Sequence, residues 1–282
     1  MNNLKAGFGR TNINPPMGIS IRGYYKPRYA EAILDDLEVN AIALQCGADK
    51  VILISVDHCG IEQKLSTEFR KAVSEVTGVP EGCIYLSATH THTGPQMTFS
   101  TEDELVKEYT SFVKRRIVDA SKFAVDDLQD AKMGYGQGKA PNVAFIRRYV
   151  MKDGSVMTNP GVNNPDIVRP VGETDESVSV LRFDRKDAES IVFVNFANHP
   201  DTVGGNKISA DWPGLLRKNV EKILDGTKCI FFNGAQGDVN HVNVHPKQGD
   251  LNNMFIDFDD VARGYSHTEY IARVVTGGVL QA

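Results

Sequence analysis

Short apolar runs, rich in β-branched and aromatic residues, alternate along this chain with stretches of helical periodicity. Glycine, aspartate or asparagine bounds the runs, which is typical of strands, several of them buried on both faces. The runs predict strands over residues 39–44, 51–56, 83–86, 178–183, 191–196 and 229–232. Between two further apolar stretches, Asp153 and Gly154 predict a hairpin closed by a two-residue turn.

Apolar residues recur at helical spacing over residues 65–76 and again over residues 105–120. Thr101 and Glu104 form a candidate capping box for the second of these helices. A third helix is predicted to start at Asp211, acting as its cap, with Pro213 in the first turn. A terminal helix is expected within residues 262–280. This alternation predicts an α/β protein with mixed β-sheets flanked by helices.

Composition narrows the class of partner. The chain has 282 residues, of which 41% are hydrophobic, so it can bury the core of one large domain or of two smaller ones. Charged residues are mixed in sign and the net charge is −5, which excludes the basic footprint that nucleic acid requires. A small molecule is therefore the expected partner, and the sequence leaves the oligomeric state open.

The sequence also bears on the compartment. The first residues lack the apolar region of a secretory signal, and no apolar run is long enough for a transmembrane segment. Four widely spaced cysteines suit reduced core thiols better than a disulfide framework or a Cys-x-x-Cys zinc site. We therefore expect a cytoplasmic protein. The cysteines are Cys46, Cys59, Cys83 and Cys229.

Polar segments follow four of the predicted strands, at residues 56–60, 88–92, 197–201 and 233–241, and they hold five of the seven histidines. Loops beyond strand ends are where α/β sheets bind ligands, because neighbouring strands deliver their following residues to one edge. Imidazole nitrogens and carboxylates are ligands that zinc selects, whereas calcium and magnesium sites are built from oxygen. A zinc-type site is the inference.

The pair His90 and His92 is the strongest local signal. In an extended segment, residues two apart project from the same face, so a metal ion or an activated nucleophile could lie between these rings. Arg147 and Arg148 should point in opposite directions for the same reason, and an inward guanidinium could hold a substrate carbonyl or its oxyanion. A surface or loop position is the simpler interpretation of His241, His245 and His267.

Four carboxylates could add ligands or could orient a ligating imidazole. For each one alone, a helix cap or a turn-stabilising role is the simpler interpretation. They are Asp57, Asp201, Asp211 and Asp238.

These segments resemble the N-terminal catalytic domain of the neutral/alkaline non-lysosomal ceramidases, which are zinc-dependent amidases. The most specific match is Ala-Thr-His-Thr-His-Thr-Gly-Pro at residues 88–95, and others lie at residues 6–11, 142–160, 196–211 and 233–240. The resemblance implies one ceramidase-like domain over residues 1–282. It further implies that His90 and His199 bind zinc, that His92 contacts the reacting group, and that Arg147 binds the polar part of the amide.

Two departures from the family pattern bear on mechanism. Asn240 stands where the family carries a serine proposed to take part in amide cleavage, and asparagine cannot act as a nucleophile. The family's remaining zinc ligands, a glutamate and a tyrosine, would lie beyond this chain. Either the domain is incomplete at its C-terminus, or aspartate or histidine residues here complete the coordination.

The leading hypothesis is a zinc-dependent hydrolase of linear amides that acts on a small-molecule amide or a lipid-like substrate. In it, Asp238 supports the site and Asn240 contacts the substrate. The first alternative is a degenerate domain that binds metal without catalysis. The second is a two-metal phosphoesterase, suggested by Asp57-His58, Asn198-His199 and the His-Thr-His string, although the order of these segments along the chain fits it poorly.

Overall fold

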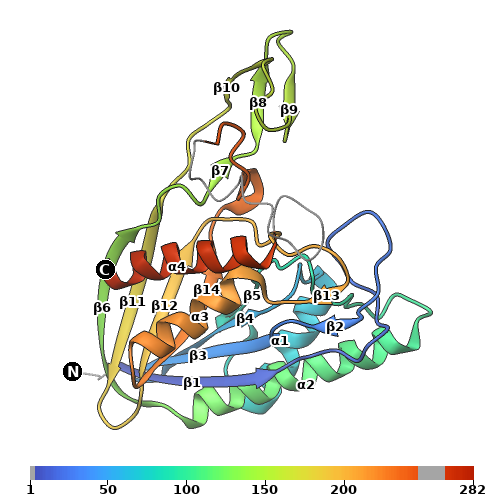
Figure 1. The fold of residues 1–282 in the computed structure, drawn as a ribbon. Helices are drawn as coiled ribbons and strands as arrows, with labels where there is room; N and C mark the ends of the chain where they lie inside the picture. The colour runs from blue at the N-terminus through green and yellow to red at the C-terminus, as the bar shows by residue number, and fades with distance from the viewer. Residues whose placement is uncertain (1–3, 247–263) are drawn as a thin grey trace.

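The computed structural model describes residues 4–246 and 264–282 (Figure 1). Its centre is an eight-stranded mixed sheet in the order β14-β12-β11-β6-β1-β3-β4-β5. The pairs β4–β5 and β12–β14 are parallel and the other pairs are antiparallel, as the α/β prediction with mixed sheets requires. The strands are β1 (Leu4–Asn12), β3 (Glu38–Cys46), β4 (Asp49–Val56), β5 (Ile84–Ala88), β6 (Gln129–Lys139), β11 (Ser177–Arg185), β12 (Ser190–Phe196) and β14 (Thr227–Asn233).

The sheet folds over on itself, so that edge strand β14 contacts both β4 and edge strand β5. Apolar side chains from both halves of the sheet meet between them, including Phe8, Ile42, Phe183 and Phe232. Helices α1 (Gln63–Thr77) and α2 (Glu104–Asp126) cover one outer face, and α3 (Asp211–Ile223) and α4 (Tyr265–Gln281) cover the other. The result is a four-layer arrangement of helices, sheet, sheet and helices.

Helix α2 approaches β1 closely because two glycines face it. A Cβ atom built on Gly7 would lie 2.1 Å from Ala124 O, and one on Gly9 would lie 2.1 Å from Ala120 O. The alternate residues of β1 include Phe8, which points into the core between the two half-sheets. The glycine-rich start of the chain is thus required by helix packing.

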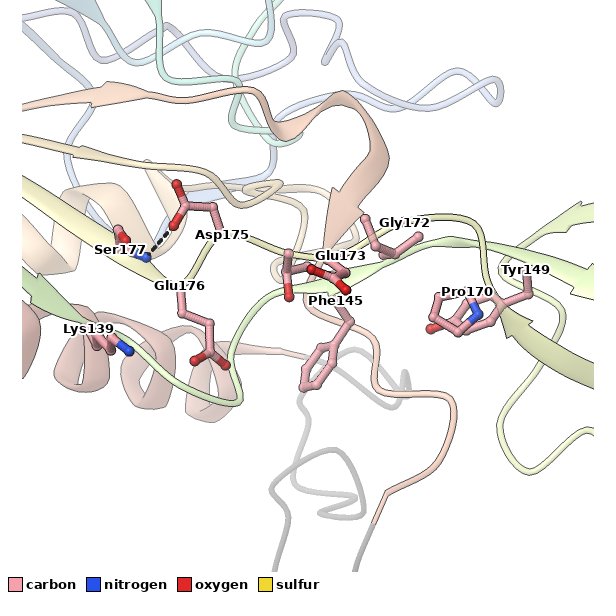
Figure 2. A pocket seen from close by; sticks show the side chains of 11 residues that line it. Lys139, Phe145, Tyr149, Pro170, Gly172, Glu173, Asp175, Glu176 and Ser177 are labelled. Atoms are coloured by element: carbon pink, nitrogen blue, oxygen red, sulfur yellow. Dashed lines mark hydrogen bonds between the residues drawn. The ribbon is translucent and has the colours of Figure 1, made fainter.

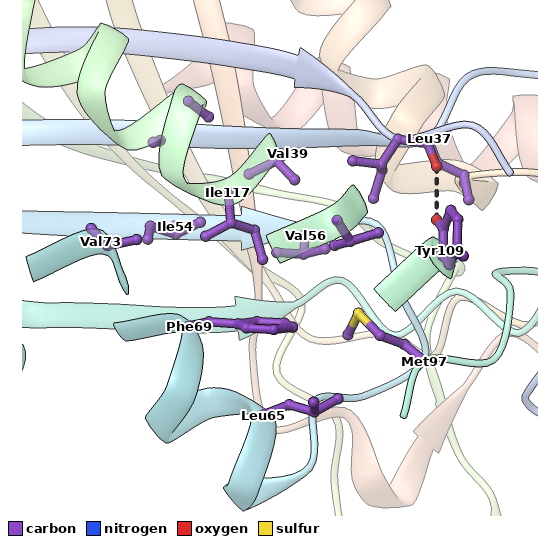
Figure 3. Close-up of a cluster of buried hydrophobic side chains, with 14 of the residues drawn as sticks. Leu37, Val39, Ile54, Val56, Leu65, Phe69, Val73, Met97, Tyr109 and Ile117 are labelled. Carbon is purple, nitrogen blue, oxygen red and sulfur yellow. Dashed lines mark hydrogen bonds between the residues drawn. The ribbon is translucent and has the colours of Figure 1, made fainter. Parts of the chain in front are cut away.

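The core beneath α1 and α2 follows the predicted helical spacing (Figure 3). Phe69 and Ile117 are fully buried in it, and the buried Tyr109 hydroxyl donates to Ile13 O at 2.7 Å. The start of α2 differs from the prediction. Its N-cap is Asp103, whose carboxylate accepts from two N–H groups of the first turn, whereas Thr101 accepts from the N–H of Asp103.

The predicted cap of α3 also has a different role. Helix α3 begins at Asp211, but Ala210 is the N-cap residue and Asp211 has a left-handed φ of +57°. The buried Asp211 carboxylate accepts from the N–H groups of Thr202, Val203 and Trp212. Burial raises the pKa of this carboxyl to about 6. Asp211 therefore ties the loop after β12 to the start of α3 more than it caps the helix.

A three-stranded sheet projects beyond the layers (Figure 1). The predicted hairpin joins its strands β8 and β9, but the loop has three residues, because Met151 N–H donates to Ser155 O and Gly154 N–H donates to Met151 O. Gly154 has a φ of +82°, which suits a glycine bulge. The remaining short strands are β2 (Ala32–Ile33), β7 (Phe145–Ile146), β8 (Arg148–Met151), β9 (Val156–Thr158), β10 (Ile167–Pro170), β13 (Lys207–Ile208) and β15 (Val239–Asn240), with 3-10 turns η1 (Glu81–Cys83) and η2 (Gln236–Asp238).

The cysteines are only partly as predicted. None of the four forms a disulfide, but Cys46 and Cys83 are exposed, Cys59 is half-buried and only Cys229 is a core thiol. Among residues 4–246 and 264–282, no helix combines the length and the apolar character needed to cross a membrane.

Candidate metal centre

The loops that follow β4, β5, β12 and β14 meet at one end of the folded sheet. His90 N–H donates to His58 O at 2.9 Å, which joins the loop after β5 to the loop after β4. His92 N–H donates to Pro200 O at 3.1 Å, which joins the loop after β5 to the loop after β12. The structure thus brings together the histidine-bearing segments that lie far apart in the sequence.

The pair His90 and His92 does not lie on an extended segment, contrary to the prediction. Strand β5 ends at Ala88, and His90 has a left-handed φ of +79°, which is uncommon for a residue with a side chain and typical of functional sites. The two rings nevertheless meet edge-to-face, with centroids 4.9 Å apart. The turn is held by the buried hydroxyl of Thr91, which donates to Ser209 O at 2.7 Å.

Three imidazoles converge at this end of the sheet. His90 Nε2 lies 3.0 Å from His199 Nε2 and 3.3 Å from His92 Nε2. On the opposite side of each ring, His90 Nδ1 contacts the carbonyl of Cys59 and His199 Nδ1 lies 3.2 Å from Gln236 O. A carbonyl oxygen can only accept, so both Nδ1 atoms carry the proton and both Nε2 atoms present a lone pair.

The directions of the pKa shifts of His90 and His199 agree with this assignment of their protons. Burial lowers the pKa of both His90 and His199, and the nearby Arg147 guanidinium acts in the same direction. Both rings are therefore neutral at pH 7. Two Nε2 lone pairs that face one another at 3.0 Å repel unless a cation lies between them. This is the electronic arrangement of ligating histidines whose other nitrogen donates to a carbonyl.

The spacing also fits zinc. Two Zn–N bonds at a tetrahedral angle hold their nitrogens about 3.3 Å apart, close to the distances of His90 Nε2 from His199 Nε2, 3.0 Å, and from His92 Nε2, 3.3 Å. A second combination of donors is present, since Cys59, His90 and His92 can each place a ligand atom within 4.8 Å of the others. We favour His90 and His199 as the central pair, because burial raises the pKa of the Cys59 thiol and their lone pairs face each other directly.

Arg147 and Arg148 differ in exposure, in line with the predicted opposite directions, but Arg147 lies between β7 and β8 and not within a strand. Arg147 is half-buried, and its charge acts on His90 and His199. Arg148 is exposed and binds the Asp238 carboxylate through Nε and an Nη nitrogen at 2.7 and 2.9 Å. The Asp238 carbonyl also accepts from Arg147 N–H at 3.1 Å. Asp238 therefore supports the backbone that carries Arg147, while its carboxylate is held by Arg148.

Asn240 is buried in a hydrogen-bond network of its own. Its Nδ2 donates to Asn159 Oδ1 at 2.9 Å, and its Oδ1 accepts from Val242 N–H at 3.0 Å. Its strand pairs with β7, next to the turn that carries Arg147. In this geometry the asparagine fixes the loop after β14 to the projecting hairpin.

The remaining predicted carboxylates are engaged. Asp57 is 1% exposed and binds the Arg217 guanidinium, so it is unavailable as a metal ligand, and the phosphoesterase alternative loses one of the segments that suggested it. Asp201 Oδ1 lies 2.9 Å from His241 Nδ1. His241 and His267 are buried with ring centroids 5.2 Å apart, which corrects the surface interpretation of both.

His58 yields a prediction for acid stability. It is 1% exposed, its Nε2 donates to Pro95 O at 2.7 Å, and burial lowers its pKa to about 4. An unfolded histidine titrates near pH 6.5, so between pH 6.5 and 4 the unfolded chain binds a proton that the native state excludes. This contribution to stability is complete above pH 6.5 and is lost as the pH falls through that window.

We expect urea denaturation to show that the wild type loses about 3 kcal/mol more than His58→Gln between pH 7 and pH 4. Glutamine can keep the donor to Pro95 without a titrating group. Parallel declines of the two proteins over this range would contradict the prediction.

Sequence reasoning missed two side chains that surround His92. The ring of Tyr24 lies edge-on to His92 with centroids 5.5 Å apart, and the Arg28 guanidinium stacks over Tyr24 at 4.2 Å. Arg28 also donates to His92 O at 2.6 Å. Both side chains come from a loop some 64 residues earlier in the chain, and no local sequence pattern predicts a contact over that distance.

A separate pocket of about 610 Å³ lies where β6, β7 and β11 approach the projecting sheet (Figure 2). Its walls combine Phe145 and Tyr149 with Glu173, Asp175 and Glu176, and Asp175 accepts from Ser177 N–H. Among the described residues that line it, none is a histidine.

No family model matches the chain. Two solved structures are similar to it over its whole length. One is a crystal structure of neutral ceramidase from Pseudomonas aeruginosa, with a TM-score of 0.75, 18% identity and 45% of that chain covered. The other is a ceramidase complexed with C2, with a TM-score of 0.77, 19% identity and 44% covered. The chain thus spans less than half the length of these proteins. Throughout its length it has the fold of the neutral ceramidase structures, which confirms the predicted resemblance at the level of the fold.

Proposed function

We propose that this chain carries the metal centre of a zinc-dependent hydrolase that cleaves linear amides. The observation that carries the proposal is the pair of Nε2 lone pairs of His90 and His199, which face each other at 3.0 Å while each Nδ1 is fixed by a carbonyl. Similarity to ceramidase structures favours an amide as the bond that is cleaved.

In this proposal, different residues of the chain have different roles in the reaction. Zinc, when bound, polarises a carbonyl and makes water a better nucleophile at neutral pH. His90 and His199 would hold it, and His92, whose Nε2 is 3.3 Å from that of His90, would hydrogen-bond to the reacting group. Arg147 supplies a fixed positive charge beside this cluster, where it can stabilise the negative charge that develops on the amide oxygen.

Asn240 restricts the mechanism. It cannot form a covalent intermediate, and its amide is already bound to Asn159 and to the backbone of Val242. Direct attack by water is therefore the proposed route. A lipid-like substrate remains part of the proposal by analogy with the ceramidase structures, and the site itself requires only an amide with an accessible carbonyl.

Adjacent arginines provide a matched test. With zinc-loaded protein and fatty-acyl amides of a fluorescent arylamine, Arg147→Ala is expected to lower kcat/KM by about 10²–10³-fold, the usual effect of removing an oxyanion-stabilising donor. Arg148→Ala removes the same charge from an exposed salt bridge and should change kcat/KM by no more than roughly twofold.

Equal losses in the two variants would contradict the role given to Arg147. If zinc-loaded protein released no arylamine from short or long acyl amides, the amidase proposal would fail, and a metal-binding domain without catalysis would be the better description.

A further inference from the structure

We infer that Asn233, at the end of β14, is a positioning residue that holds the two proposed zinc ligands at their working separation. This inference rests on the metal centre proposed above. Asn233 lies in neither of the loops that carry His90 and His199, and its side chain acts on both.

The Asn233 amide joins the residues that immediately precede the ligands. Its Nδ2 donates to Thr89 O and to Asn198 O, each at 3.0 Å. Its Oδ1 accepts from Asn198 N–H at 3.4 Å. Because carbonyl oxygens only accept, the orientation of this amide is unambiguous. Thr89 precedes His90 and Asn198 precedes His199, so one planar group fixes the entry of both imidazoles.

The turn after Asn233 makes further contacts with the end of β12 and with His199. Gly234 N–H donates to Phe196 O at 3.0 Å, and a Cβ built on Gly234 would lie 3.0 Å from the Ala197 side chain, so this turn packs closely against the end of β12. Two residues later, Gln236 O contacts His199 Nδ1 at 3.2 Å and selects its tautomer. The end of β14 therefore sets the position and the protonation of a ligand that it does not itself provide.

The chain offers a matched control in Asn195, one strand away. Its Nδ2 donates to Phe232 O at 2.9 Å, and its backbone pairs with Phe232 in the parallel ladder, so this hydrogen bond of its side-chain amide stays within the sheet. Asn→Asp at each position is nearly isosteric and removes the donors. At Asn233 it also places a carboxylate against two carbonyl oxygens, which should push the loops apart.

The experiment measures zinc affinity by competition with a chromogenic chelator, together with the visible spectrum of the cobalt-substituted protein and the thermal midpoint. We expect Asn233→Asp to weaken zinc binding by about 10–100-fold, the usual cost of losing a partner that orients metal ligands. Its cobalt spectrum should shift, because the ligand geometry changes. Asn195→Asp should keep the wild-type affinity and spectrum even if its thermal midpoint falls equally.

Asn233→Ser keeps the test valid if the aspartate variant does not fold, since one hydroxyl can replace one of the two donors and an intermediate loss of affinity is expected. Equal zinc affinity in the Asn233 and Asn195 variants, with wild-type protein that binds zinc, would overturn this inference and leave the proposed function standing. Wild-type protein that binds no zinc would overturn both.

Discussion

Replacing His199 by alanine is expected to abolish stoichiometric zinc binding and, with it, amide hydrolysis. His199 is 5% exposed and its Nε2 lone pair faces that of His90 at 3.0 Å, so it supplies half of the donor pair on which the proposed centre rests. Loss of a direct ligand should exceed the roughly 10–100-fold weakening that follows loss of an orienting partner. Elemental analysis of purified protein, as zinc per chain, measures the effect, and His90→Ala should behave in the same way.

Two further histidines sharpen this test. His245 is exposed, so His245→Ala should leave the zinc content unchanged. His92→Ala distinguishes a ligand from a substrate contact. If His92 touches the reacting group, as the resemblance implies, the variant should keep zinc and lose turnover. If His92 pairs with Cys59 and His90 as a ligand, zinc should be lost as well. Full zinc occupancy in both His90→Ala and His199→Ala would refute the proposed centre.

Most of the fold could be predicted because burial imposes local patterns. The buried strands β3, β4, β12 and β14 appear in the sequence as short apolar runs, and α1 appears as a helical repeat. The prediction was wrong where more than one nearby side chain can accept from the same backbone N–H groups. Thr101 and Asp103 both can accept at a helix start, and the structure uses Asp103. The curvature that brings β14 onto β5 has no local signature at all.

The individual residues of the site could be predicted from the sequence, but their arrangement could not. His90, His92, His199 and Arg147 stand in distinctive strings, and the structure gathers all four around one place. Their convergence depends on contacts between distant segments, which single-sequence patterns do not encode. Asn233, for example, reaches Thr89 across 144 positions of the chain.

The burial of His241 and His267 could not be predicted from local sequence patterns either. Both lie in or beside polar segments that suggest a surface, yet both are buried and their ring centroids lie 5.2 Å apart. Burial lowers the pKa of His267 to about 3, so the ring is held neutral inside the fold. Tertiary packing, which is invisible to local hydropathy, decides the environment of such residues.

Arg217→Met is expected to destabilise the protein by about 3–5 kcal/mol, which is typical of removing one partner of a buried ion pair. Arg217 is 2% exposed and binds Asp57, with one Nη–Oδ1 distance of 3.0 Å, and Glu38 at 3.2 Å. It joins α3 to the ends of β3 and β4. Without the guanidinium, the Asp57 carboxylate would remain in the interior without its cation, and Glu38 would keep only Arg10, whose Nε lies 3.4 Å away. Urea denaturation at pH 7 measures the loss.

The pH dependence separates this mechanism from simple loss of packing. Burial raises the pKa of the Asp57 carboxyl, and Arg217 opposes that effect. In Arg217→Met the native state should therefore take up a proton at a higher pH than the unfolded chain does, so the deficit should shrink as the pH falls from 7 towards 5. Adding Asp57→Leu should recover part of the stability, because the uncompensated charge is removed.

An exposed pair in the same fold supplies the control. Lys122→Met breaks a surface i,i+4 bridge to Asp126 and should cost no more than about 0.5 kcal/mol, with no comparable pH signature. A deficit in Arg217→Met that is equally small would mean that the buried pair does not hold the layers together. A large deficit that is independent of pH would instead assign it to lost side-chain packing. Asp57 directly precedes His58, whose carbonyl accepts from the N–H of His90. The buried ion pair of Asp57 with Arg217 therefore also supports the position of His90, the proposed zinc ligand.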